Sequence, residues 1–253
     1  QQAAFDSIQE NFKSFDVNLL HGVTASGKTE IYIKLLEQYI KEGKQVLFLL
    51  PEIALTTQLV QRLTAYFGNE VAVFHSKYTN NERIEVWNQV LENSPKAKVV
   101  IGVRSALFLP FSNLGCIIVD EEHEQTFKQH DPAPRYHARD AAIVLAKQHG
   151  AKVVLGSATP SLETYYNVQS NKYGLIELKV RYGNVVLPEI KLVDLKDKYF
   201  RKKMSGHFSD ELLEEITETL SKGEQVILFQ NRRGFSPFVE CMTCGHVPHC
   251  PSC

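Results

Sequence analysis

The sequence lacks the long hydrophobic runs and the strong net charge that would place it in a membrane or in a broadly basic class. No apolar run approaches the roughly 20 residues that a transmembrane helix needs. No charged segment followed by an apolar stretch opens the chain, so no secretory signal is visible. The formal net charge of −1 over 253 residues gives no overall basic signature for nucleic acid, although it is compatible with local contacts to a backbone.

Cysteine is scarce and unevenly placed. Four of the five cysteines lie within residues 241–253. This clustering argues against a disulfide framework spread over a secreted domain and fits a metal site in a reducing compartment. Cys116 stands inside an apolar run and is interpreted as a small buried residue.

Short apolar runs alternate with segments of helical spacing. The predicted strands are residues 17–20, 45–50, 71–74, 98–103, 116–120 and 152–155. The predicted helices are residues 31–40, 54–67, 82–91 and 135–149. Continuous apolar strands joined by helices predict a parallel sheet covered on both faces, and therefore an α/β fold class.

The later part of the chain predicts a connector and a second α/β unit. Residues 174–201 contain Pro188, scattered charge and a short β-like run. Ser209 predicts a helix N-cap, and residues 225–229 predict one more buried strand. Because the chain opens in what reads as a helix and stops among cysteines, we expect a piece of a longer protein. The predicted organisation is a first α/β domain at 1–175, a connector at 176–205, the start of a second α/β domain at 206–238 and an incomplete cysteine-rich region at 239–253.

A phosphate-binding loop is predicted at residues 22–29, which read G-V-T-A-S-G-K-T and fit G-x-x-x-x-G-K-[ST] at every fixed position. A predicted strand precedes it and a helix follows, which disfavours a chance glycine-rich turn. Such a loop turns its backbone N–H groups toward phosphates at a helix N-terminus. Lys28 is expected to reach the β- and γ-phosphates, and Thr29 to offer its hydroxyl to Mg²⁺. The residues expected to bind nucleotide here are Gly22, Thr24, Ser26, Gly27, Lys28 and Thr29.

A buried strand ending in a carboxylate is predicted at residues 116–120, and E-E-H follows it. Ligands of open α/β sheets bind at the carboxyl ends of strands. We therefore expect Asp120 to hold Mg²⁺ and Glu121 to orient and deprotonate the attacking water, with a solvated acidic turn as the alternative. His123 is expected to sense the γ-phosphate. The turn G-S-A-T-P at 156–160, Thr159 included, can bond both the acidic motif and a nucleic-acid backbone, but alone it is a weak signal.

These three motifs, in this order, resemble superfamily 2 helicases, and finer stretches resemble one group of them, the bacterial primosomal replication-restart DNA helicases. The stretches are L-P-E-I-A-L-T at 50–56, V-R-S-A-L-F at 103–108, R-Y-H-A-R-D at 135–140 and N-R-R-G-F at 231–235. The resemblance implies two RecA-like motor domains and ATP-dependent 3′–5′ unwinding at stalled forks in the bacterial cytoplasm. It implies single-stranded and forked DNA, single-stranded DNA-binding protein and primosome proteins as partners. It also implies later motifs on the second motor domain, so we expect this chain alone to bind ATP with Mg²⁺ but to hydrolyse it slowly.

The resemblance assigns further residues. Gln1 matches an adenine-contacting glutamine, with Gln2 as the alternative register. Residues 51–56 and 102–107 resemble segments that touch single-stranded DNA, and residues 125–139 resemble an aromatic-rich loop that couples DNA binding to hydrolysis. Aromatic rings interleaved with cations suit base stacking and phosphate contact, although packing under the loop is the alternative for the rings. The residues expected to contact DNA are Arg104, Ser105, Phe127, Lys128, Arg135, Tyr136 and Thr159.

Two C-x₂-C pairs near the end of the chain are a strong zinc pattern in a reducing compartment. One zinc held by all four is an alternative, but the five residues between the pairs are fewer than the roughly 15–20 of zinc ribbons. The resemblance implies two interleaved zinc sites, one pair at each, both incomplete here. His246 and His249 are candidate substitute ligands, with a solvated loop favoured for both. The four cysteines are Cys241, Cys244, Cys250 and Cys253.

Two other functions are compatible with the motifs. One is a different motor on the same core, such as an RNA helicase or a duplex translocase, which the zinc pairs disfavour. The other is a non-catalytic module that uses the nucleotide site as a switch and the zinc pairs for docking. A Glu121→Gln variant would keep the function of a switch but abolish turnover by a motor.

Overall fold

The computed structural model describes residues 1–51, 57–75, 78–184, 188–229 and 244. The chain divides into two compact units, residues 1–186 and 187–253, which are treated separately below. No helix in the described ranges is long and apolar enough to cross a membrane.

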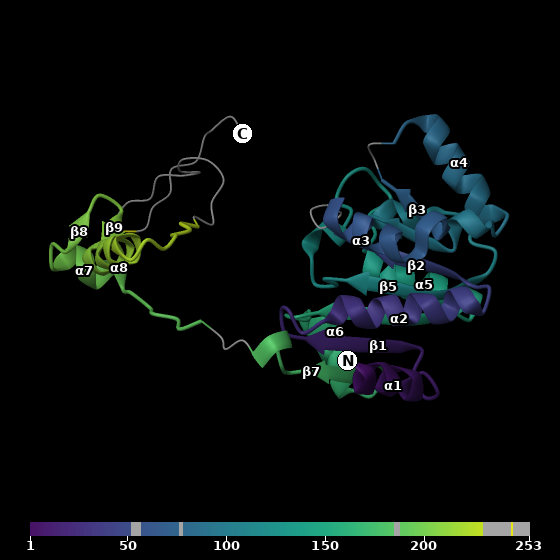
Figure 1. Ribbon diagram of the computed structural model, residues 1–253, viewed down its shortest axis with the longest axis horizontal. Helices are drawn as coiled ribbons and strands as arrows, with labels where there is room; N and C mark the ends of the chain where they lie inside the picture. Colours follow the sequence, from purple (N-terminus) through teal and green to yellow (C-terminus); the bar gives the residue numbers. More distant parts are fainter. Residues whose placement is uncertain (52–56, 76–77, 185–187, 230–243, 245–253) are drawn as a thin grey trace. The chain divides into compact units, whose positions relative to one another are not determined.

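The first unit is built on a seven-stranded parallel sheet with the strand order β3-β4-β2-β5-β6-β1-β7 (Figure 1). The six strands predicted within residues 1–175 are confirmed, and β7 is an addition. The strands are β1 (Val17–Gly22), β2 (Gln45–Leu49), β3 (Val71–Phe74), β4 (Val99–Gly102), β5 (Leu114–Asp120), β6 (Lys152–Ser157) and β7 (Gly174–Leu178).

Helices cover both faces of this sheet because its strands are apolar on both sides. Alternate residues of β2 enter different cores: Val46 and Phe48 pack with α1, α2 and α3, whereas Leu47 and Leu49 pack with α4 and α5. The helices are α1 (Gln2–Asn11), α2 (Lys28–Lys41), α3 (Thr57–Phe67), α4 (Asn80–Leu91), α5 (Ala138–His149) and α6 (Leu162–Gln169). Short 3-10 segments are η1 (Gly68–Glu70), η2 (Pro95–Ala97), η3 (Arg104–Phe108), η4 (Gln125–Phe127) and η5 (Tyr182–Asn184).

Two segments of this unit differ from the prediction. Helix α5 begins at Ala138 rather than at residue 135, because Lys128 and His137 pair as an isolated antiparallel bridge. Residues 174–178, which were predicted to begin the connector, instead form β7 at the edge of the sheet and pair with β1. The apolar pattern of this edge strand is weak: Ile176 is buried in a core cluster, whereas Leu175 and Leu178 are partly buried and only pack against the clusters.

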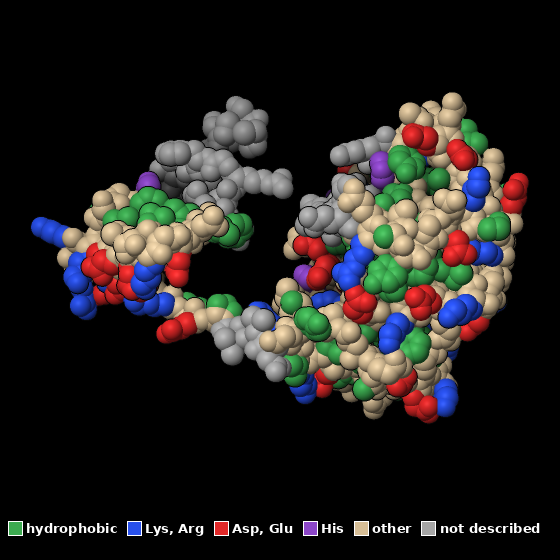
Figure 2. Space-filling view, in the orientation of Figure 1, with side chains coloured by type: hydrophobic (Ala, Val, Ile, Leu, Met, Phe, Trp, Pro, Cys, Tyr) green, Lys and Arg blue, Asp and Glu red, His purple; other side chains and the backbone are tan. Residues whose placement is uncertain are grey.

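The second unit contains α7 (Leu195–Phe200), the two-residue strands β8 (Met204–Ser205) and β9 (Phe208–Ser209), and α8 (Asp210–Ser221). The predicted N-cap is confirmed, because Ser209 Oγ accepts a 3.2 Å hydrogen bond from the Leu212 amide. The strand predicted at 225–229 is wrong: these residues form no ladder, and Phe229 is 84% exposed. A buried strand needs neighbours to pair with, and within the described residues this unit offers only the β8–β9 hairpin. Hydrophobic side chains consequently gather on its surface (Figure 2).

Candidate nucleotide site and nucleic-acid interface

The strand order of the first unit brings the three predicted motifs together. Strand β6 lies between β1 and β5, so their carboxyl ends are neighbours at one edge of the sheet. In the ladder Asp120 pairs with Gly156, and His21, directly before the phosphate loop, pairs with Ser157. Segments almost 100 residues apart in sequence therefore form one site, where ligands of open parallel sheets bind.

The loop between β1 and α2 has the form of an anion cradle. Gly27 caps α2 with a left-handed φ of 88°, and a Cβ there would lie 2.0 Å from Gln1 Nε2. Lys28 Nζ donates a 2.9 Å hydrogen bond to the Gly22 carbonyl, which holds the ammonium over the loop. The buried hydroxyl of Ser26 has no hydrogen-bond partner among the described residues. A glycine cradle, a helix N-terminus and a free buried hydroxyl together suit a phosphate group.

A cavity of about 660 Å³ opens over this loop. Residues of the phosphate loop and the two acidic residues at the end of β5 line this cavity. Gly22 does not line it, but its carbonyl accepts the hydrogen bond that holds Lys28. Gln1 lines the cavity, while Gln2 donates to Asp6 and accepts from Lys34 elsewhere, which favours Gln1 as the nucleotide-contacting register. The lining residues are Gln1, Thr24, Ala25, Ser26, Gly27, Lys28, Thr29, Glu30, Arg62, Asp120, Glu121 and Tyr182.

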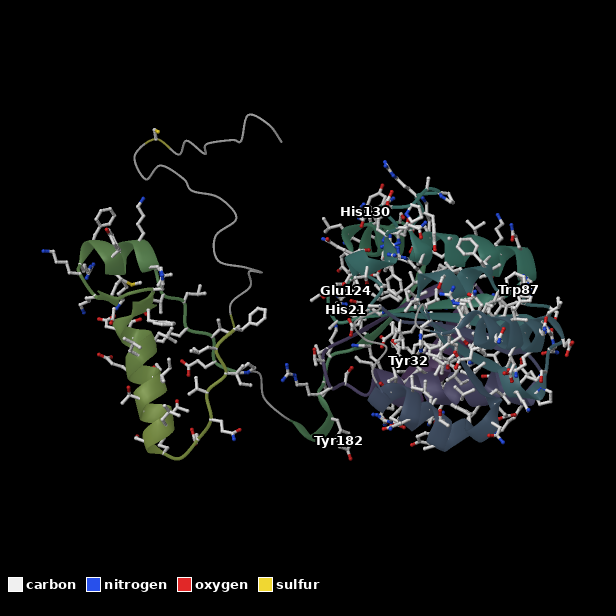
Figure 3. All side chains as sticks on the ribbon, turned by 90° about the horizontal axis from the view of Figure 1, so that it is seen from above. His21, Tyr32, Trp87, Glu124, His130 and Tyr182 are labelled. Carbon is white, nitrogen blue, oxygen red and sulfur yellow. The ribbon has the colours of Figure 1, made fainter. Side chains whose placement is uncertain are left out.

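Tyr182 and Arg62 are cavity residues that sequence reasoning missed. The Tyr182 amide donates a 2.9 Å bond to the Ala25 carbonyl, which ties residues after β7 to the phosphate loop. Figure 3 shows Tyr182 at the rim of the first unit and Tyr32 inside it. Arg62, on α3, pairs with Glu30. No local pattern marks either residue, because both reach the cavity only through the packing of distant segments.

The two acidic residues at the end of β5 have different environments. Burial raises the pKa of Asp120 to about 6, although the hydrogen bond from Tyr32 and the charge of Lys28 act in the opposite direction. Glu121 lines the cavity with a left-handed φ of 50°, an uncommon backbone for a non-glycine residue that often marks functional sites. With Thr29, these carboxylates put hard oxygen donors of the type Mg²⁺ prefers on one cavity wall. The residues present therefore fit a nucleotide with Mg²⁺.

His123 connects the acidic motif with the turn after β6. Its Nδ1 lies 2.8 Å from Ser157 Oγ and 3.7 Å from a carboxylate oxygen of Glu121. Its Nε2 lies 3.4 Å from Thr159 Oγ1, and the Thr159 amide donates to Ser157 Oγ at 3.0 Å. His123 does not line the cavity, so its role as a γ-phosphate sensor stays a prediction.

The predicted DNA-contacting residues divide by exposure. Phe127 is 1% exposed in the core, so the packing alternative holds for it and stacking by its ring is a wrong prediction for this structure. The Arg104 guanidinium donates to the carbonyls of Thr126 (3.0 Å) and Lys128 (3.4 Å), so it also braces this loop. Its contact with phosphate stays a prediction, as do the DNA contacts of the half-buried Ser105.

An aromatic pair stands at the surface beside this loop. Tyr136 packs edge-on to Phe108 at 5.2 Å, and its hydroxyl donates to the Arg104 carbonyl at 3.4 Å. Phe108 is 58% exposed and was not selected from the sequence, although it closes the V-R-S-A-L-F stretch. Arg135 and Thr159 are exposed, and Lys128 is half-buried. These side chains present rings and cations together, as single-stranded nucleic acid requires.

Most of the predicted zinc region lies outside the described residues, as do residues 52–56 and 231–235. That region includes Cys241, Cys250, Cys253 and both candidate histidines. Cys244 is described and is an exposed free thiol. The described residues contain no cluster of three or more His, Cys, Asp or Glu side chains placed to hold a metal ion, so zinc binding stays a prediction.

The fold and the cavity define a nucleotide-binding domain of the helicase type. The family model for DEAD/DEAH box helicases matches residues 1–168, and the chain belongs to this family. Over its whole length the chain is similar to Replication restart protein PriA of Bacillus subtilis (48% identical over 255 residues, 31% of that protein) and of Haemophilus influenzae (49% over 253 residues, 34% of that protein). It therefore spans about a third of the length of these relatives.

The solved structures agree on the fold. The structure of RecG bound to a three-way DNA junction matches with a TM-score of 0.55 at 20% identity, covering 88% of this chain and 27% of that one. This likeness concerns the fold alone. The predicted α/β class and the predicted resemblance to replication-restart helicases are both confirmed.

Proposed function

We propose that this chain is the ATP-binding core of an ATP-dependent 3′–5′ DNA helicase that acts in replication restart and primosome assembly at stalled forks. The observation that carries the proposal is the meeting of Lys28, Asp120 and Glu121 on one cavity of about 660 Å³ above a phosphate loop. The restart role is supported by the similarity to PriA proteins over the whole chain.

The chemistry is in-line attack of water on the γ-phosphorus of ATP, which breaks the bond to the bridging oxygen and releases ADP and phosphate. Lys28 and the amides at the start of α2 neutralise phosphate charge, and Glu121 orients the water and accepts its proton. Asp120 and Thr29 hold Mg²⁺, which supplies neutralisation of phosphate charge when bound. The Gln1 amide, which lies over Gly27, contacts the base.

The nucleic-acid surface of the first unit consists of Phe108, Lys128, Arg135 and Tyr136. Its rings stack on bases and its cations contact phosphates of single-stranded DNA. Forked DNA, single-stranded DNA-binding protein, primosome proteins and two zinc ions belong to the same proposal for the whole protein. Alone, this chain binds ATP with Mg²⁺ but turns it over slowly, because the resemblance assigns further catalytic motifs to the second motor domain.

The experiment that tests the proposal is ATP hydrolysis by the whole protein, alone and with forked DNA, single-stranded DNA or RNA. Lys28→Ala is expected to abolish the DNA-stimulated rate. Lys41→Ala is the matched control, since this lysine lies at the exposed end of the same helix and away from the cavity. Stronger stimulation of hydrolysis by RNA than by DNA would favour an RNA helicase instead. ATP binding with no stimulation by any nucleic acid would favour the nucleotide switch and remove the helicase assignment.

A further inference from the structure

A completely buried carboxylate directly follows the two acidic residues of the cavity. Glu122 has no exposed surface and does not line the cavity. Its Oε1 accepts a 2.7 Å bond from the Ser161 amide, and its Oε2 accepts a 2.8 Å bond from Thr164 Oγ1. Its own amide donates to the Gly156 carbonyl at 3.0 Å. Glu122 therefore joins the end of β5 to the turn that leads from β6 into α6.

The charge partner of Glu122 comes from a third element. Arg139, in the first turn of α5, lies 3.0 Å from Glu122 Oε2 through its Nη1 and 2.6 Å from Ser161 Oγ through the same atom. Its Nε donates to Asp140 at 2.8 Å, and Asp140 is exposed. Within the buried part of this network, Glu122 and Arg139 carry the charge.

Each of the three elements leads to a different part of the proposed machinery. Glu122 lies one residue from Glu121, and Ser161 lies two residues from Thr159, which contacts His123. Arg139 lies in the first turn of the helix that follows the loop carrying Lys128, Arg135 and Tyr136. The ion pair thus joins the residue next to the water-orienting carboxylate to the helix that directly follows the nucleic-acid loop.

Stability alone gives no reason for a buried ion pair here. Apolar side chains of similar size usually fill such a space at no loss of stability, because burying two charges is costly even when they pair. What the pair adds is geometric: a shift of β5 relative to α5 breaks the contact between the two buried charges, which costs free energy. The ion pair therefore favours discrete arrangements of β5 and α5. Coupling between two sites requires an element with such discrete arrangements.

We propose that Glu122 and Arg139 are positioning residues that couple the nucleotide site to the nucleic-acid loop at residues 128–137. Through their ion pair, nucleic acid bound at the loop changes the position of Glu121, and nucleotide in the cavity changes the position of the loop. This inference rests on the proposed function, because that function places nucleotide at one end of the Glu122–Arg139 ion pair and DNA at the other.

The test uses the whole protein with Glu122→Gln, which keeps the size of the side chain and removes its charge. We measure ATP hydrolysis without DNA, its stimulation by single-stranded DNA, and the affinity for fluorescent single-stranded DNA with and without a non-hydrolysable ATP analogue. The expected result is unstimulated hydrolysis within about twofold of wild type, stimulation reduced about tenfold or more, and loss of the nucleotide effect on DNA affinity. Loss of both the stimulation and the nucleotide effect on DNA affinity is required, because the proposal makes one ion pair responsible for both.

Asp140→Asn is the matched control, since it removes the exposed partner of the same arginine and is expected to preserve stimulation. If Glu122→Gln proves unstable in thermal unfolding, Glu122→Gln combined with Arg139→Met removes both charges and leaves neither unpaired. Stimulation preserved in a folded variant, or loss of basal and stimulated hydrolysis in equal proportion, would overturn the proposal. A wild-type protein that no nucleic acid stimulates would overturn the proposed function, and this inference with it.

Discussion

The phenol hydroxyl of Tyr32 donates a 2.8 Å hydrogen bond to Oδ1 of Asp120, from α2 to the carboxyl end of β5. Burial, followed by the negative charge of Asp120, raises the pKa of Tyr32 well above its ordinary value, so the phenol keeps its proton and remains the donor. The contact fits because residue 156 is glycine: a Cβ there would lie 1.7 Å from the hydroxyl. Tyr32 therefore fixes the orientation of the carboxylate that is proposed to hold Mg²⁺.

Replacing Tyr32 by Phe is expected to weaken Mg²⁺-dependent nucleotide binding by about tenfold, since a hydrogen bond to a charged group contributes roughly 1.5–3 kcal/mol. Binding of a fluorescent ATP analogue over a Mg²⁺ series measures this. Affinity in the presence of a chelator should not change. Tyr39→Phe is the control, because Tyr39 is buried on the same helix, whereas the hydrogen bond to Asp120 comes from Tyr32. Equal effects of the two variants would show that Tyr32 acts only through packing.

Gly156→Ala is expected to destabilise the first unit and to impair nucleotide binding. The new methyl group would overlap the Tyr32 hydroxyl and approach Asp120 Oδ1 to 3.1 Å, and overpacking of this kind costs about 1–3 kcal/mol. Combining it with Tyr32→Phe removes the clashing oxygen. Thermal unfolding should therefore show the double variant to be more stable than Gly156→Ala alone. Additive losses in the double variant would contradict the steric explanation.

Asp120→Asn is expected to stabilise the protein at neutral pH when neither nucleotide nor Mg²⁺ is present. Burial raises the pKa of Asp120 to about 6, so the folded state holds this proton more tightly than the unfolded state. Ionisation of Asp120 therefore lowers the free energy of unfolding, by up to about 3 kcal/mol. The gain in the variant should be complete above about pH 6, decline below it and vanish below about pH 4.

Thermal unfolding of wild type and Asp120→Asn across this pH range measures the difference. A stability gain that does not depend on pH would show that ionisation of Asp120 is not its cause. ATP hydrolysis by the variant is expected to be lost at every pH, because the amide replaces a carboxylate proposed to hold Mg²⁺.

Tyr182→Ala is expected to weaken binding of ATP by several-fold and to leave binding of inorganic triphosphate unchanged. The ring lines the cavity yet is 80% exposed, which leaves it available for contact with the base or ribose, and such aromatic contacts contribute about 0.5–1.5 kcal/mol. The backbone bond from Tyr182 to Ala25 survives the substitution. Calorimetry with both ligands separates the outcomes, and Tyr165→Ala, at an exposed ring outside the cavity, is the control. An equal loss of affinity for ATP and for inorganic triphosphate would show that Tyr182 acts through the phosphate loop and not through the base or ribose.

Local patterns were sufficient for the elements and for the motif residues. The six strands predicted in the first unit, the phosphate loop and the Ser209 cap depend on periodicity, glycine and hydroxyl placement within a few residues, and the structure contains all of them. Failures occurred where neighbours decide the outcome. Residues 174–178 become a strand because β1 offers an edge, whereas residues 225–229 find no partner strand in the described part of their unit.

The sequence by itself determined the α/β class, the phosphate loop and the acidic motif, because each is encoded in short-range spacing. Only the tertiary structure decided that β6 lies between β1 and β5, that Glu121 faces the cavity while Glu122 is buried against Arg139, and that Phe127 packs inside. Adjacent residues of one type carry no local signal for which side they face. That choice depends on the free energy of burial against segments far away in the chain.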